Sequence, residues 1–132
     1  MQKGPRTSKS SGDTGVAQLL AQAISAFQAG NIFEAHRLCA IVIDKDKKNI
    51  VALHLFGVIE AMRKNTDEAL RLFDRALKID PHNADILADK GNVLTQLGRH
   101  HDALLCYQQA VSLNAGHWHA LQNQGATLLL LK

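Results

Sequence analysis

From Val16 onward, apolar residues recur at i, i+3 and i+4, the spacing that places side chains on one face of an α-helix. The clearest example is residues 50–83, where two such runs are separated by a short turn. Asn65 followed by Glu68 fits the capping box that begins a helix, and Pro81 cannot continue one. The stretch therefore predicts two helices joined as a hairpin.

The same pattern returns at a constant period of about 34 residues, which indicates an internal repeat. The repeats predicted are residues 16–49, 50–83, 84–117 and a partial fourth, 118–132. A single hairpin cannot bury its apolar face, so neighbouring repeats must stack. Small residues let the paired helices approach closely, and an aromatic ring fills the space beside them. The equivalent positions are Leu19, Leu53, Leu87 and Leu121; Ala23, Gly57, Gly91 and Gly125; Ala35, Ala69 and Ala103; and Cys39, Phe73 and Tyr107.

These features resemble those of the tetratricopeptide repeat (TPR) family. The repeat period, the small-residue and alanine positions, the aromatic position and Pro81 carry the resemblance over residues 16–132. The resemblance implies an all-α fold, a right-handed TPR superhelix (an α-α solenoid) of about seven helices. The departures from the family pattern are Leu at its frequent tryptophan position and Cys39 at the aromatic position of the first repeat.

Residues 1–15 are rich in Gly, Ser, Thr and Lys and lack periodicity, so we expect a flexible N-terminal tail. Basic residues outnumber Asp13 there, so +2 of the formal net charge of +3 lies in this segment. The repeats are therefore nearly neutral, which argues against nucleic acid as a partner. No apolar run approaches the roughly 18 residues that a membrane span needs, so we expect no membrane insertion.

The two cysteines, Cys39 and Cys106, are far apart in sequence and fit no metal-binding or redox spacing. Each lies on the apolar stripe of a predicted helix, so we expect buried free thiols. Free thiols suit a reducing compartment, which predicts a cytoplasmic protein.

The TPR resemblance implies a scaffold that binds a protein or peptide along a concave surface lined by the first helix of each pair. The residues predicted to face this groove are Leu20, Ile24, Phe27, Val51, His54, Val58, Met62, Asp85, Asn92, Thr95, Gln96, His119 and Gln122. Apolar side chains dominate the first two repeats and polar ones the others. We hypothesise an apolar anchor near Phe27 and Met62 and hydrogen bonds near Asn92 and Gln96. Alternatively, Leu20, Ile24 and Phe27 simply pack under an N-terminal segment.

Two subclasses of the family can be compared with this groove. TPR domains that clamp a chaperone's C-terminal carboxylate use Lys, Arg and Asn, whereas the matching positions here are apolar or acidic, which argues against that ligand. Those positions are Leu20, Ile24, Leu55, Asp85 and Asp89.

Protein O-linked glycosyltransferases, bacterial ones included, carry asparagines along their TPR arrays, and Asn92 and Asn123 are candidates for such positions. Substrate recruitment for a missing catalytic domain is therefore the alternative function.

No catalytic or cofactor motif competes with the scaffold interpretation. The sequence has no Ser–His–Asp order, phosphate-binding glycine loop or His–Glu zinc motif, so we predict neither catalysis nor a cofactor in this segment. The seven histidines include the pair His100 and His101, but no set with metal-ligand spacing, so solvated or capping roles are expected. Glu60 stands in an apolar run, and we expect it to form an ion pair with Lys90 of the next repeat; the alternative is an acid at the edge of the groove.

Residues 128–131 read LLLL on a predicted helix that has no partner helix after it. Terminal repeats normally present a polar outer face. This apolar end predicts either a longer protein, of which the sequence is a part, or self-association through the C-terminal helix.

Overall fold

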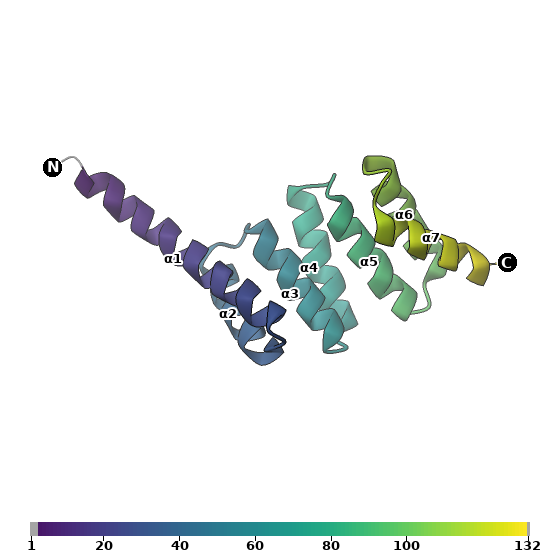
Figure 1. The fold of residues 1–132 in the computed structure, drawn as a ribbon, viewed down its shortest axis with the longest axis horizontal. Coiled ribbons are helices and arrows are strands. Elements are labelled where there is room, and N and C mark those ends of the chain that lie inside the picture. The colour runs from purple at the N-terminus through teal and green to yellow at the C-terminus, as the bar shows by residue number, and fades with distance from the viewer. Residues whose placement is uncertain (1–2, 132) are drawn as a thin grey trace.

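The computed structural model describes the backbone of residues 3–131 and the side chains of residues 15–131. This part of the chain forms seven α-helices and no strand, which confirms the all-α TPR prediction. Figure 1 shows the helices arranged in a row from α1 at one end to α7 at the other. Their bounds are α1 Lys3–Gln28, α2 Ile32–Lys45, α3 Ile50–Met62, α4 Thr66–Ile79, α5 Ala84–Gln96, α6 His100–Leu113 and α7 Trp118–Leu130.

Each helix packs against its neighbours in sequence, and the first helices of successive pairs also touch. Thus α3 contacts α5, and α5 contacts α7, so these helices form a continuous layer along one side of the row. The second helices, α2, α4 and α6, form the other layer. This arrangement follows from the repeat, since equal units that bury equivalent faces must stack in a regular array.

The first helix begins at Lys3, which differs from the start near Val16 and the flexible tail over residues 1–15 that the sequence predicts. Figure 1 shows this end of α1 projecting beyond α2. Once the packed part of a helix is formed, each further residue adds one hydrogen bond without a new nucleation step. The helical backbone can therefore extend past the last packed turn, a step that a search for apolar periodicity does not detect.

The turn within each helical pair contains one residue in the left-handed region, again at equivalent positions of successive repeats. These residues are Gly30 with φ 82°, Lys64 with φ 70° and Gly98 with φ 78°. Glycine adopts this conformation without steric cost, whereas the Cβ of a lysine makes it unfavourable. The repeat therefore demands a backbone shape at Lys64 that its side chain opposes.

The N-termini of the first helices are capped by side chains at equivalent positions. Asn49 accepts a hydrogen bond from the backbone of Ala52 at 3.0 Å, Asn83 does the same with Ile86 at 3.1 Å, and the ring of His117 substitutes for asparagine before α7. The capping box predicted at Asn65 is wrong. Its side chain makes no cap hydrogen bond and instead lies 3.4 Å from the Glu60 carboxylate.

The predicted ion pair between Glu60 and Lys90 is also wrong. The Glu60 carboxylate is buried and contacts Arg63 at 3.0 Å and the ring of His36 at 3.5 Å. Lys90 instead pairs with Asp74 at 2.7 Å. Glu60 and Lys90 therefore each pair with a residue one helical turn away or on an adjacent helix. Such pairs need less extension of the side chains, which lowers the entropic cost of fixing them.

In the core, a glycine of the first helix packs directly against an aromatic ring of the second. A Cβ built on Gly57 would lie 2.5 Å from the Phe73 ring, and one on Gly91 would lie 2.5 Å from the Tyr107 ring. Both rings are almost completely buried, at 0% and 1% exposure. The ring therefore packs directly on the bare backbone and sets the distance between the paired helices.

Gly91→Ala is expected to lower the free energy of unfolding by about 1–3 kcal/mol, because the added methyl group overpacks the buried Tyr107 ring. Gly125→Ala is the matched control. No described atom lies within 4 Å of the added Cβ, so the better helix propensity of alanine should raise stability by about 0.5–1 kcal/mol. Urea denaturation of both variants measures the difference, and equal effects of the two substitutions would contradict the ring contact.

Lys64→Gly is expected to raise the free energy of unfolding by about 0.5–1 kcal/mol, because it removes the Cβ from a left-handed backbone position. Lys64→Ala keeps the Cβ and should change stability by less than about 0.5 kcal/mol. Thermal melts of the two variants side by side separate the backbone effect from the loss of the charge. A stabilisation of similar size in both would point to the charge instead.

Candidate peptide-binding groove

A cavity of about 390 Å³ lies between α1 and α3. Its walls are mainly apolar, and an aspartate of α5 also lines it. Moving an apolar side chain from water into an apolar cavity is favourable, so this cavity can accept a large aliphatic or aromatic residue. The lining residues are Ile24, Phe27, Val51, His54, Leu55, Val58 and Asp89.

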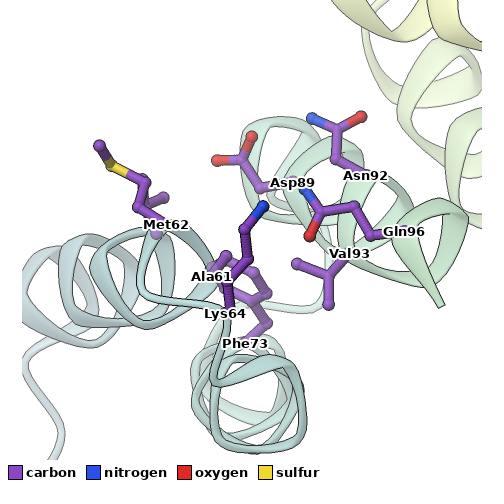
Figure 2. A pocket seen from close by; sticks show the side chains of 9 residues that line it. Ala61, Met62, Lys64, Phe73, Asp89, Asn92, Val93 and Gln96 are labelled. Atoms are coloured by element: carbon purple, nitrogen blue, oxygen red, sulfur yellow. The ribbon is translucent and has the colours of Figure 1, made fainter.

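A second cavity of about 400 Å³ lies between α3 and α5. Figure 2 shows Met62 at one rim and the polar side chains of Asp89, Asn92 and Gln96 at the other, with Lys64 between them. Val58 and Asp89 line both cavities, so the two are adjacent parts of one groove along the first helices. The other lining residues are Ala61, Phe73 and Val93.

A hydrogen-bonded histidine–aspartate pair spans the junction of the two cavities. His54 Nε2 of α3 lies 2.6 Å from Asp89 Oδ2 of α5, and both side chains are about two-thirds buried. The His54 ring also packs edge-on against Phe73, with ring centroids 6.0 Å apart. The pair therefore ties two successive repeats together at the groove floor, and the imidazole occupies one oxygen of the acid.

Asn92 connects three helices through its side-chain oxygen. This oxygen accepts hydrogen bonds from the Tyr107 hydroxyl of α6 and from Asn123 of α7, both at 2.7 Å. Burial raises the pKa of the Tyr107 hydroxyl, so that group remains protonated and able to donate at neutral pH. Among the described residues, no hydrogen bond involves the Asn92 amide nitrogen, which leaves its two N–H donors for a ligand.

Eight of the thirteen residues predicted to face the groove line these cavities, and five do not. Ile24, Phe27, Val51, His54 and Val58 lie at the first cavity, and Val58, Met62, Asn92 and Gln96 at the second. The five residues outside both cavities are Leu20, Asp85, Thr95, His119 and Gln122.

Two of the five residues outside the cavities are already engaged within the protein. Asp85 lies 2.7 Å from the ring of His117, which is the N-cap of α7, and the Thr95 hydroxyl donates to the Gly91 carbonyl at 3.0 Å. The first contact links α5 to the N-terminus of α7, and the second lies within α5, so both side chains have partners inside the protein.

The sequence prediction of groove residues misses Lys64, and it considers Leu55 and Asp89 only as matches to the carboxylate clamp. Leu55, Asp89 and Asn123 occupy equivalent positions in successive repeats. Positions 51, 55, 58 and 62 follow i, i+4, i+7 and i+11, which is the stripe that a 3.6-residue period predicts. Counting that stripe in full could have identified Leu55 and Asp89. Lys64 lies in the turn after α3 and carries no periodic signal.

No metal centre is evident in the described part of the chain, where no three His, Cys, Asp or Glu side chains gather to hold an ion.

Both cysteines are buried and unbonded, as predicted. Burial raises the pKa of the Cys39 thiol to about 11, so it stays protonated at neutral pH. None of the described helices is both long enough and apolar enough to span a bilayer.

Comparison with known families agrees with this architecture. Two tetratricopeptide repeat profiles match the sequence, one over residues 20–84 and the other over residues 60–125. The chain belongs to the tetratricopeptide repeat family. Its repeats also resemble those of an O-GlcNAc transferase from Thermobaculum terrenum, with a TM-score of 0.85 and 26% identity over 89% of this chain and 22% of that one.

Other TPR proteins are similar over different shares of their length. The BBSome complex member BBS4 of Bos taurus is 30% identical over 75% of this chain and 17% of its own length. The first TPR of Spaghetti (RPAP3), solved bound to an HSP90 peptide, has a TM-score of 0.84 and 16% identity over 88% of this chain and 92% of that one. The chain thus spans less than a quarter of BBS4 and of the transferase, and the RPAP3 likeness shows the fold alone.

Asn92→Ala is expected to lower the free energy of unfolding by about 1–3 kcal/mol, because the Tyr107 hydroxyl and the Asn123 amide lose their shared acceptor. Gln96→Ala, one turn further along the same groove, is the matched control and should change stability by less than about 0.5 kcal/mol because its side chain is exposed. Urea midpoints at constant m-value measure both effects. An Asn92 variant as stable as the control would show that the three-helix link contributes nothing.

Proposed function

We propose that this TPR domain binds an extended peptide segment of a protein partner along the groove formed by α1, α3 and α5. An apolar side chain of the ligand enters the cavity between α1 and α3. The polar part of the ligand reaches the cavity between α3 and α5. The observation that carries this proposal is the change from apolar to polar lining across the His54–Asp89 pair, within one continuous groove.

The apolar cavity supplies the affinity in this proposal. A buried aliphatic or aromatic anchor contributes most of the binding energy in typical peptide complexes. Phe27 and Val58 offer two facing walls from different helices, and Leu55 extends the apolar surface between them. The interpretation of Phe27 as a residue packed under an N-terminal segment is less well supported, because its side chain lines an open cavity.

The polar cavity supplies orientation. The Asn92 amide donates to a backbone carbonyl of the ligand, and Gln96 can both donate and accept. Because Asn92 is held by Tyr107 and Asn123, its donors are preorganised, which lowers the entropic cost of binding. Asp89 leaves little attraction for a ligand's C-terminal carboxylate at this point, so an internal segment is the better ligand.

The proposed role is non-catalytic and requires no cofactor, nucleic acid or membrane. It rests on the family assignment and on a groove whose two cavities carry few charged side chains, Lys64 and Asp89, of which Asp89 is hydrogen-bonded to His54. The two buried free cysteines fit a reducing compartment, and we infer a cytoplasmic location from them.

The test is a peptide library displayed on phage and selected on the folded domain, followed by titration of selected peptides against variants. Met62→Ala and Gln96→Ala are each expected to weaken binding by about 5-fold or more, because each removes contact surface at the polar cavity. Phe33→Ala is the matched control. Phe33 is 82% exposed on α2 and lines neither cavity, so its removal should leave the affinity unchanged.

Two results would contradict the groove proposal. The first is a set of selected peptides whose affinities are insensitive to both groove variants. The second is an affinity that falls equally with the Phe33 control, which would place the ligand on the outer layer of helices.

A second candidate function is substrate recruitment for a protein O-linked glycosyltransferase. The likeness of the repeats to the Thermobaculum terrenum transferase and the linked asparagines Asn92 and Asn123 favour it. In that case the groove would present a segment to a catalytic domain elsewhere in a longer protein. The coding sequence of the intact gene separates the candidates, since an adjoining glycosyltransferase domain supports recruitment and a protein of repeats alone supports the scaffold.

A further inference from the structure

Asp89 of α5 lines both cavities of the groove, and no other acidic residue of the described chain lines either one. Its side chain is 35% exposed, and Figure 2 shows its carboxylate on the rim opposite Met62. Water and salt screen a partly buried charge less than a fully exposed one. This carboxylate therefore attracts or repels a ligand group in the groove more strongly than a surface aspartate would.

The hydrogen bonds of Asp89 leave one carboxylate oxygen open. Oδ2 lies 2.6 Å from His54 Nε2, whereas no hydrogen bond within the described chain reaches Oδ1. A neutral imidazole gives Oδ2 one N–H donor but no positive charge, so the pair keeps the negative charge of the carboxylate. The groove thus offers one acceptor and one negative charge that the protein itself does not use.

Several other carboxylates are neutralised by a permanent cation inside the protein. Asp89 has no arginine or lysine partner in the described chain, and Lys64, which lines the second cavity, forms no ion pair with it there. A ligand can supply the cation that Asp89 lacks. The carboxylates that do pair with arginine or lysine are Glu34, Glu60, Glu68, Asp74 and Asp102.

Lys64 limits where a ligand cation can lie. It stands in the turn after α3, at the second cavity, where its ammonium group repels another positive charge. Among the described residues, neither lysine nor arginine lines the first cavity. A ligand cation is therefore favoured at the junction of the cavities, beside the apolar anchor.

We propose that Asp89 selects a basic residue in the ligand, a lysine or arginine placed two residues from the apolar anchor. The cationic group donates to the open Oδ1, while Oδ2 keeps its bond to His54. In an extended peptide, side chains two residues apart point the same way and lie about 7 Å apart, which suits two adjacent cavities. This inference rests on the proposed function, because it names the chemistry of the peptide that the groove binds.

The probe is a phage-displayed peptide library selected on the folded domain at about pH 8, where an ordinary histidine is neutral and lysine is charged. Groove-dependent peptides are those whose binding Met62→Ala weakens. One of them is synthesised in two versions, with lysine or with glutamine at the position of its basic residue. Both versions are titrated against the unmodified domain, Asp89→Asn and Asp44→Asn. The amide at position 89 can still accept from His54, and Asp44, on α2 and outside both cavities, is the matched control.

The proposal predicts that groove-dependent peptides are enriched in lysine or arginine two residues from an apolar residue. Asp89→Asn should weaken binding of the lysine version by about tenfold or more and of the glutamine version by less than about threefold, because only lysine loses a charged partner. Asp44→Asn should change neither affinity by more than about twofold, since salt screens a charge outside the groove. A misfolded variant would lose both versions alike, so the difference between the versions reports the pairing with Asp89.

Three results would overturn the proposal. Groove-dependent peptides without the basic residue, or an equal effect of Asp89→Asn on both versions, would do so while leaving the groove as a peptide-binding site. A loss of lysine-peptide affinity in Asp44→Asn equal to that in Asp89→Asn would assign the attraction to the overall charge of the domain. If no selected peptide depends on Met62 or Gln96, the proposed function itself fails, and the role of Asp89 fails with it.

Discussion

The contact between an aromatic ring and a bare glycine backbone fixes the spacing of this fold. Phe73 on Gly57 and Tyr107 on Gly91 leave no room for even one methyl group. A larger residue at either glycine would push the paired helices apart. Because each repeat is positioned by contact with the repeat before it, all later repeats would be displaced as well. The spacing of each pair thus depends on one aromatic ring, and the same contact recurs 34 residues later in the next repeat.

The same rings position the candidate site. The edge of Phe73 supports His54, which pairs with Asp89 at the junction of the two cavities. The Tyr107 hydroxyl holds Asn92, which in turn holds Asn123 of the last helix. Packing and the shape of the groove are therefore connected, since residues that line the groove are oriented by residues that face the core. This connection explains how a groove built from few polar groups can be preorganised.

The helices and their repeat could be predicted from the sequence because they depend on local periodicity. Equivalent positions of successive repeats carry matching residue types, so the fold follows from register alone. The buried cysteines followed from the same stripes. The start of α1 at Lys3 could not be predicted in this way, because that segment has no apolar face.

The candidate site could be predicted only in part, since it depends on which side chains pair across helices. The sequence predicts a pair between Glu60 and Lys90, but in the packed structure the Glu60 carboxylate contacts Arg63 and His36. The sequence predicts that Asn92 faces the groove, but it does not indicate that the side-chain oxygen is used within the protein. Such pairings depend on distances of a few ångströms between repeats, and periodicity does not resolve them.

The most direct test of the central constraint is a double-mutant cycle on the Gly57–Phe73 contact, using Gly57→Ala, Phe73→Cys and the double variant in urea denaturation. If the ring contact sets the helix spacing, Gly57→Ala costs about 1–3 kcal/mol beside phenylalanine and is neutral or stabilising beside cysteine, which resembles the combination of Ala23 and Cys39 in the first repeat. A coupling free energy of about 1 kcal/mol or more would support the ring contact as the determinant of helix spacing. Additivity within about 0.5 kcal/mol, the range found for independent sites, would contradict it.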